Sequence, residues 1–308
     1  MNSGDRGAWC GHGRRSDRCV GWGPAAGSCG LDRRGGDLRA LSEGVLVLTS
    51  SYFERTGPSR YRPTVHAGGA WADDELHMAP VSGAVIDAME RFLGDGASSS
   101  LMYARVSFDI LGKLPAIEFE VQVRVARPGR TIELLEATVI ADGRAVLQAR
   151  AWLLSVQDTS SVAGGFPDPL PPPDDLPRGI LDPVWSGGFV ASLDVRPCEV
   201  PVPGRTRVWL TTETPFFADE PASELARFIG LVDTANGVAV RESPKDWMFP
   251  NVDLTIHLYR RPRGRWVGLD TTVVFGADGH GLTSSVLHDV DGPVGRSEQI
   301  LTVRSLRR

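Results

Sequence analysis

The sequence predicts an α+β fold built from two copies of one unit, each an antiparallel sheet with one long helix. A helical stretch over residues 80–92 and a second over residues 221–240 are each followed by four strand-like runs. Turn signals follow in the same order in both copies: Pro128-Gly129 and Asp142-Gly143, then Asp278-Gly279 and Asp291-Gly292. Two copies of one unit usually form a pseudo-symmetric body with its site where they meet.

The composition is that of an ordinary globular protein. The 308 residues are 42% hydrophobic and 23% charged, and this length suits about two domains. A net charge of -5 argues against nucleic acid or an anionic membrane surface as a partner. No apolar run approaches the ~20 residues that cross a bilayer, and the N-terminus has no apolar signal segment. Beyond the first 30 residues Cys198 is the one cysteine, which predicts a cytoplasmic location.

We expect four segments along the chain. Residues 1–44 are rich in glycine and lack hydrophobic periodicity, so they are predicted to be a disordered tail. Residues 45–158 and 181–308 form the two units. Residues 159–180 form a proline-rich linker, with five prolines between 167 and 173, that favours extended structure. At roughly 3 Å per residue such a linker can cross a whole domain, which allows the two units to lie side by side.

Strands are expected on both sides of each helix. Residues 117–125 alternate strictly between apolar and polar, so one face of that strand is buried and the other is solvated. The Asp-Gly and Pro-Gly pairs predict hairpins between antiparallel strands. Further strand-like runs are residues 50–56, 60–65, 189–196, 205–212, 251–259, 266–275, 282–290 and 294–304.

The first helix is predicted from apolar spacing and from its end signals. Pro80 suits its first turn and Gly94 suits its end. Ser82 and Gly83 form helix poorly, but such small residues allow a backbone or a ligand to approach closely. The predicted buried face consists of Val81, Val85, Met89 and Phe92.

The second helix is expected to begin with the acidic pair Asp219 and Glu220, followed by Pro221. Two polar residues, Asp233 and Asn236, lie late in this helix, three positions apart and therefore on one face. The predicted buried stripe consists of Leu225, Phe228, Ile229 and Val232.

One strand carries polar residues that could perform chemistry. In residues 251–259 the even positions are apolar, so Asp253, Thr255 and His257 share the other face. Aspartate is depleted in strands, so the presence of Asp253 in this strand needs an explanation. Either this face is solvated, or the carboxylate lies beside a cleft as a base or as a group that orients water.

The comparison of the two copies adds a second candidate, Gln299 in the last strand. At matched strand positions we place Val106 and Ala151 in the first copy against Asp253 and Gln299 in the second. An amide can both donate to and accept from one water, which suits positioning.

Three segments together resemble a known family. They are Asn251-Val-Asp253-Leu-Thr-Ile-His257, Asp233-Thr-Ala-Asn236-Gly, and Asp291-Gly-Pro-Val-Gly-Arg-Ser-Glu-Gln299. They resemble the double-hotdog acyl-CoA thioesterases of the thioesterase II type, and more closely the thioesterase-like proteins common in actinobacteria. The likeness covers about residues 50–305. It implies a double hotdog, with each antiparallel sheet wrapped around one long helix, and an enzyme that hydrolyses acyl-CoA thioesters.

The resemblance also implies a catalytic set, because an Asp, a Ser or Thr and a Gln of the second hotdog hold the hydrolytic water in that family. The Asp falls on Asp253 and the Gln on Gln299. The expected hydroxyl position is occupied by Val274, and Thr272, two residues earlier on the same strand face, could replace it, as could Thr271 after a register shift. If the hydroxyl is missing, the loss of one donor costs on the order of 3 kcal/mol, about a hundredfold in rate.

The implied mechanism needs no metal and no cofactor. A thioester carbonyl at the start of a hotdog helix meets free backbone N–H groups, while the acyl tail lies between helix and sheet. The implied partner is acyl-CoA or a similar acyl thioester. Because hotdog sheets have edges that commonly pair with another subunit, we also expect a homo-oligomer.

Other functions are weighed against this one. No Gly-x-Ser-x-Gly nucleophile motif occurs, and no Asn-Pro separates Asp253 from His257 as a hotdog hydratase would require. The histidines lack the spacing of metal ligands. The main alternative is a non-catalytic acyl-CoA or lipid-binding protein on the same fold, because a fold alone does not decide function.

Overall fold

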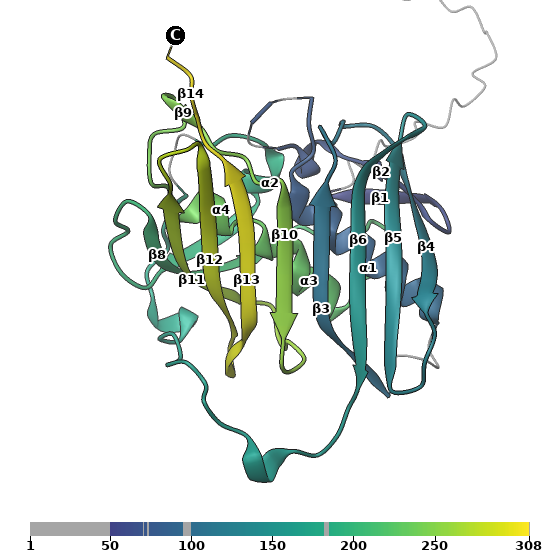
Figure 1. Cartoon of the computed structure of the whole chain (residues 1–308). Helices are drawn as coiled ribbons and strands as arrows, with labels where there is room; N and C mark the ends of the chain where they lie inside the picture. The colour runs from purple at the N-terminus through teal and green to yellow at the C-terminus, as the bar shows by residue number, and fades with distance from the viewer. Residues whose placement is uncertain (1–49, 70, 73, 95–99, 182–184, 308) are drawn as a thin grey trace, which may run out of the picture. The chain divides into compact units, whose positions relative to one another are not determined.

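The computed structural model describes residues 50–69, 71–72, 74–94, 100–181 and 185–307. The predicted tail, residues 1–44, lies outside them. Within the described ranges one antiparallel sheet of twelve strands carries both repeats (Figure 1), in the order β1-β2-β4-β5-β6-β3-β10-β13-β12-β11-β8-β7. The strands of the first repeat are β1 (Phe53–Gly57), β2 (Arg60–Pro63), β3 (Leu101–Ile110), β4 (Phe119–Arg127), β5 (Ile132–Ala141) and β6 (Arg144–Ser155).

The second repeat supplies the other half of the sheet. Its strands are β7 (Leu193–Pro197), β8 (Arg205–Thr212), β10 (Asp253–Leu258), β11 (Val267–Phe275), β12 (His280–Asp289) and β13 (Gly292–Thr302). A separate short pair is formed by β9 (Trp247–Met248) and β14 (Arg304–Ser305). The strand order reads the same from both ends of the large sheet when β1 is matched with β7 and β3 with β10. The two repeats are therefore related by a pseudo-twofold between β3 and β10, where Val106 pairs with Ile256.

Two main helices pack against the sheet. The first, α1 (Met78–Leu93), agrees with the predicted range, and the residues that it buries run from Met78 to Met89. Phe92 was expected on the buried face but is 48% exposed, because it lies beyond that buried stretch. The second, α3 (Glu224–Val232), begins at the N-cap Ser223, whose hydroxyl accepts from the N–H of Ala226.

The second helix is shorter than predicted. It ends at Asp233, and a separate turn, α4 (Ala235–Val238), follows. The run predicted as a strand over residues 189–196 begins instead with the short helix α2 (Gly188–Ala191) before β7. The remaining strands agree with the predicted runs to within a few residues at each end.

The two long helices cross at small residues, as Ser82 and Gly83 predicted, and what approaches them is the backbone of α3. The Ser82 hydroxyl donates to the carbonyl of Ile229 over 3.1 Å. A methyl group on Gly83 would lie 2.6 Å from the ring of Phe216, and one on Gly230 would overlap the same ring. Glycine at both positions therefore allows the helices to approach this closely.

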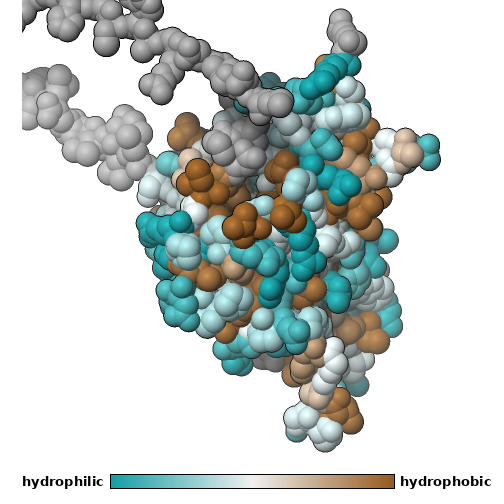
Figure 2. Space-filling view, turned by 90° about the vertical axis from the view of Figure 1, so that its left-hand side faces the viewer, coloured by the Kyte–Doolittle hydropathy of each residue, from teal (hydrophilic) through white to brown (hydrophobic). Residues whose placement is uncertain are grey.

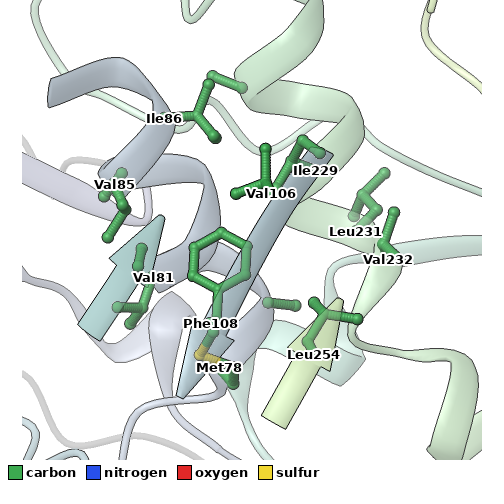
Figure 3. Packing of buried hydrophobic residues seen from close by; sticks show 14 of the residues in the cluster. Met78, Val81, Val85, Ile86, Val106, Phe108, Ile229, Leu231, Val232 and Leu254 are labelled. Atoms are coloured by element: carbon green, nitrogen blue, oxygen red, sulfur yellow. The ribbon is translucent and has the colours of Figure 1, made fainter. Parts of the chain in front are cut away.

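Beneath this crossing the apolar side chains of both repeats form one core (Figure 3). The residues labelled there come from both helices and from the two central strands: Met78, Val81, Val85, Ile86, Val106, Phe108, Ile229, Leu231, Val232 and Leu254. The repeats therefore share a hydrophobic interior as well as a sheet.

The linker packs against the second repeat. It contains two short 3-10 turns, η2 (Ser160–Val162) and η3 (Pro173–Asp175). The buried side chain of Leu170 contacts Trp209 and Trp266, and the Trp209 indole N–H donates to the carbonyl of Pro171 over 2.8 Å. The predicted boundaries between the two units remain predictions, because the sheet and the core run through both.

Segments of the same chain bond to both edge strands. The N–H of Phe53 in β1 donates to Phe216, and the N–H of Gly179 donates to Val195 in β7. The side of the molecule on which β8 and β11 lie mixes hydrophilic and hydrophobic residues at its surface (Figure 2). Some backbone hydrogen-bonding groups of the edge strands, which suggested a homo-oligomer, are thus already used within the chain. Oligomerisation remains a prediction.

Among the described residues no helix is long and apolar enough to span a membrane.

The helix crossing gives a stability prediction. Replacing Gly230 with Val places a side chain against Phe216 and should lower the free energy of unfolding by about 1–3 kcal/mol, as overpacking does. Urea denaturation measures this change. Gly164→Ala is the control, because a methyl group there meets no atom within 4 Å. Equal stability of the two variants would contradict the role given to the crossing.

Candidate active site

A buried carboxylate, that of Asp233, lies where the two repeats meet. The residue caps the end of α3 and is only 6% exposed. Its Oδ1 atom accepts from the side-chain amides of Asn251, over 2.8 Å, and Gln299, over 2.9 Å. Burial raises the pKa of Asp233 to about 7, although the two amide hydrogen bonds lower it. Such a carboxyl group can exchange a proton near neutral pH.

Local structure explains why these three side chains converge. The end of α3 at Asp233 places this residue over β13. In β13 the fully buried Gln299 is on the inner face of the sheet, opposite Thr283 of β12. Asn251 precedes β10, forms a bridge with Leu301 of β13 and also donates to the carbonyl of Asp253. The backbone of the second repeat thus fixes both amides that reach Asp233.

The first repeat contributes His77, the N-cap residue of α1. Its Nδ1 atom accepts from the N–H of Ala79 over 3.1 Å, so in the neutral ring the proton is on Nε2. Burial lowers the pKa of His77 to about 4, and the ring is therefore neutral near pH 7. The Nδ1 atom lies 3.9 Å from Oδ2 of Asp233. Because the imidazole is neutral, this contact is not an ion pair and leaves the carboxylate without a cationic partner there.

Two adjoining spaces reach Asp233. A cleft of about 490 Å³ extends over the start of α1, and a smaller cavity of about 50 Å³ extends toward α4. Both are lined by Trp71, His77, Asp233 and Asn251. The smaller cavity has room for a water molecule, since one water takes up about 30 Å³ in the liquid. The carboxylate therefore lies between a space of water size and a space of ligand size.

Three buried polar atoms in this region have no hydrogen-bond partner within the described residues. Oδ1 of Asn236 belongs to a residue that lines the smaller cavity, whereas Gln299, with Oε1, and Thr283, with Oγ1, line neither space. The NH₂ group of the Asn236 side chain donates to the carbonyl of Phe249. Buried polar atoms are rarely left unpaired, so these acceptors are suited to water.

Asp253 and Gln299 were expected to lie together, but the structure places them on opposite faces of the sheet. Asp253 is on the outer face of the sheet, where its Oδ1 accepts from the N–H of Ile300 over 2.7 Å, whereas Gln299 points inward. The difference follows from the alignment of the repeats. Val106 is fully buried on the inner face and Asp253 lies on the outer face, so matching the two is out of register by an odd number of residues. In a strand such a slip moves a side chain to the other face.

Neither threonine considered for the third position lines the cleft or the small cavity. Thr272 shares the outer face with Val274, which is 62% exposed. Thr271 points inward, but its hydroxyl is hydrogen-bonded to Ser285 over 2.7 Å. The polar group that accompanies Asp233 and Gln299 is instead the amide of Asn251.

Asp233 and Asn251 are site residues that the sequence did not predict, although both lie in the motifs that resemble the family. The sequence predicts Asp233 on a helix face and Asn251 at the end of a strand, with no role in the site. Their meeting depends on the register between the end of α3 and β10, which spacing alone does not define. The only signal was the presence of two acids, Asp233 and Asp253, in those motifs.

Comparison with known proteins places the chain in a family. Residues 68–154 match the acyl-CoA thioesterase N-terminal domain and residues 167–303 match the acyl-CoA thioesterase C-terminal domain. The chain belongs to the double-hotdog acyl-CoA thioesterases. Membership of this family supports thioester hydrolysis as the general chemistry. Among curated proteins no relative matches the sequence.

Solved structures show the same fold. The acyl-CoA thioesterase II TesB2 from Mycobacterium marinum is 16% identical with a TM-score of 0.60, and the match covers 84% of this chain and 97% of that one. A hot dog fold protein of unknown function from Alicyclobacillus acidocaldarius is 14% identical with a TM-score of 0.64, with 83% and 96% covered. At these identities the likeness concerns the fold, which is the predicted α+β double hotdog.

The raised pKa of Asp233 predicts a pH effect on stability. Between its ordinary value of 3.8 and about 7 the folded state holds a proton that the unfolded state has released, so the free energy of unfolding should fall as pH rises through this window. The full effect is at most roughly 4 kcal/mol. The lowered pKa of His77 acts in the opposite direction below its ordinary value of 6.5.

The contribution of Asp233 is isolated by comparison with Asp233→Asn. The variant should gain stability relative to the unmodified protein as pH rises from 4 to 7.5, measured by urea denaturation at each pH. Asp253→Asn is the control and should show a smaller difference, because Asp253 is less buried. A constant offset between the Asp233→Asn variant and the parent at all pH values would refute a raised pKa.

Proposed function

We propose that this protein hydrolyses an acyl thioester with a water that Asp233 activates and that Gln299 and Asn251 help to position. The supporting observation is the buried carboxylate with two amide donors at the inner end of a cleft that begins at α1. This proposal keeps Gln299 from the sequence-based set and replaces Asp253 and Thr272 with Asp233 and Asn251.

In this mechanism ionised Asp233 takes a proton from the water as its oxygen attacks the thioester carbonyl. A base with a pKa of about 7 is well matched to neutral conditions. The carbonyl carbon gains a C–O bond, and the oxyanion is stabilised by the dipole of α1 and by the N–H of Met78, since Pro80 has no N–H and the N–H of Ala79 donates to His77. The C–S bond then breaks, and Asp233 returns its proton to the departing sulfur. The products are a carboxylic acid and a thiol.

The two amides have distinct tasks. Each donates to Oδ1 of Asp233, which favours the ionised form against the effect of burial. Gln299 also keeps its Oε1 atom for the water, since this oxygen accepts no other hydrogen bond within the described residues. Where the family resemblance implies a hydroxyl, the amide of Asn251 donates to Asp233 and to the carbonyl of Asp253, so its task is to position the carboxylate.

The cleft supports an acyl-CoA substrate. Its walls near the start of α1 are apolar, with Leu76, Met78 and Leu114 available to an aliphatic chain or to pantetheine. Two basic residues also line it. Arg304 suits the phosphates of coenzyme A, whereas Lys113 is paired with Asp74 over 2.6 Å and with Glu75 over 3.3 Å. We propose that the enzyme works in the cytoplasm, as the scarcity of cysteine in the folded part predicts, and as a homo-oligomer.

Substitution tests the assignment of the base. Asp233→Asn should lower the rate of acyl-CoA hydrolysis by more than a hundredfold, because it removes the base but preserves the shape of the side chain. Asp253→Asn should retain activity within a few-fold. Thiol release from acyl-CoA thioesters of different chain length measures both variants, with circular dichroism to confirm folding. Loss of activity in Asp253→Asn alone would restore the assignment made from the sequence.

The amides are tested separately. Gln299→Ala should lower the hydrolysis rate by about a hundredfold, the usual cost of one positioned polar group in an acyl-transfer site. Asn251→Thr supplies the hydroxyl that the resemblance implies and should lower the rate less than Asn251→Ala. If the unmodified protein binds acyl-CoA but releases no thiol, the non-catalytic binding function is favoured.

The pH profile provides a further check. The rate at saturating substrate should rise with pH and reach a plateau, with an apparent pKa near 7, because Asp233 must lose its proton to act as a base. A rate that falls across this range would contradict the assignment of Asp233 as the base.

A further inference from the structure

A second pocket, of about 290 Å³, lies at the start of α3. It is formed by the end of α1, the start of β3, residues near the ends of β6 and β10, and the first turn of α3. Its lining includes Glu90, Leu101, Tyr103, Leu153, Leu225 and Leu258.

This pocket is the pseudo-symmetric counterpart of the active-site cleft. The cleft lies at the start of α1 near the end of α3, and the pocket lies at the start of α3 near the end of α1. In both spaces the N-cap residue of one helix also contacts an acidic residue near the end of the other helix. The N-cap residue His77 lies beside Asp233 in the cleft, and the N-cap residue Ser223 donates to Oε2 of Glu90 over 2.7 Å in the pocket.

The two spaces differ in the groups around the acid. Asp233 is reached by the amides of Asn251 and Gln299, whereas no Asn or Gln is among the residues that line the pocket. Its walls are mainly aliphatic and present leucines from β3, β6, α3 and β10. Without an amide to aim a water at a carbonyl, the pocket is suited to binding and not to hydrolysis.

One polar atom in the pocket wall needs a partner. Tyr103 is 7% exposed, and its hydroxyl makes no hydrogen bond with any described residue. A hydroxyl in this position can donate to a carbonyl or carboxylate oxygen of a ligand. At the mouth, Arg263 is 74% exposed and lies 3.9 Å from its nearest acidic partner, Asp291, so it can face an anionic group.

We propose that this pocket is a second acyl-binding site, which takes the linear chain of a fatty acid or of an acyl thioester without hydrolysing it. The volume sets the length: an apolar cavity of about 150 Å³ accommodates a benzene ring, so about 290 Å³ holds a chain of roughly ten carbons. The chain lies along the leucines with its carboxylate or thioester oxygen at Tyr103, and the anionic carrier of an acyl thioester extends toward Arg263.

Isothermal titration of the full chain with sodium decanoate tests this proposal. Leu225→Trp and Met102→Trp each fill the pocket from a partly buried position and should each remove one equivalent of bound decanoate. Leu282→Trp, at an exposed position on β12, should keep every equivalent. Tyr103→Phe should weaken binding at this site about fivefold, the usual value of one hydrogen bond.

Folded Leu225→Trp and Met102→Trp variants that bind as much decanoate as the unmodified protein would overturn the proposal. If either variant fails to fold, photo-crosslinking of the unmodified chain with a diazirine analogue of decanoic acid decides the question. Labels at residues 101–103 or 223–225 support the second site, and labels confined to the cleft refute it.

Decanoyl-CoA, titrated into Asp233→Asn, shows whether the thioester enters as well as the free acid. The number of bound chains does not depend on turnover. Failure of this proposal is therefore distinguishable from failure of the proposed hydrolysis at the cleft.

Discussion

The close crossing of α1 and α3 is the contact on which the arrangement of both sites depends. Glycines at positions 83 and 230 let the helix backbones meet over the ring of Phe216. Gly83 lies in the first half of α1 and Gly230 in the second half of α3, and the helices run in opposite directions, so the start of each lies beside the end of the other. That geometry places His77 next to Asp233 at one end and Ser223 next to Glu90 at the other. Bulkier residues at the crossing would separate both pairs.

The burial of the Asp233 carboxyl group costs stability. A carboxyl group that is almost fully buried, with a pKa raised to about 7, destabilises the folded state once it is ionised. The chain offsets part of this cost with two amide donors from Asn251 and Gln299, and among the described residues no Lys or Arg pairs with the carboxylate. A cationic partner would lower the pKa and weaken the base. The site therefore retains a group that is costly to bury and useful to a hydrolase.

The two ends of the molecule show how a duplicated unit can diverge on a constant backbone. Strand order and helix crossing are the same for both repeats, so each end has an N-cap residue, an acid and a space beneath them. At one end inward-facing amides complete a polar site. At the other end leucines and one tyrosine replace them. A few side chains on the inner face of the sheet thus distinguish the polar cleft around Asp233 from an apolar pocket.

The sequence alone determined the repeat, the antiparallel strands, the place of α1 and the small residues at the helix crossing, because hydrophobic period, turn residues and residue size are local properties. It also made Gln299 a candidate, as the resemblance implied, and the catalytic role of this residue remains a prediction. Only the tertiary structure decided which acid faces this amide. Asp253 and Asp233 both lie in the motifs of the resemblance, and the face of a strand residue changes with a slip of one position. The end of α3 at Asp233 and the register of β10 against β13 bring Asp233 inside and leave Asp253 outside. Both are settled by packing between segments distant in the chain, which local spacing does not encode.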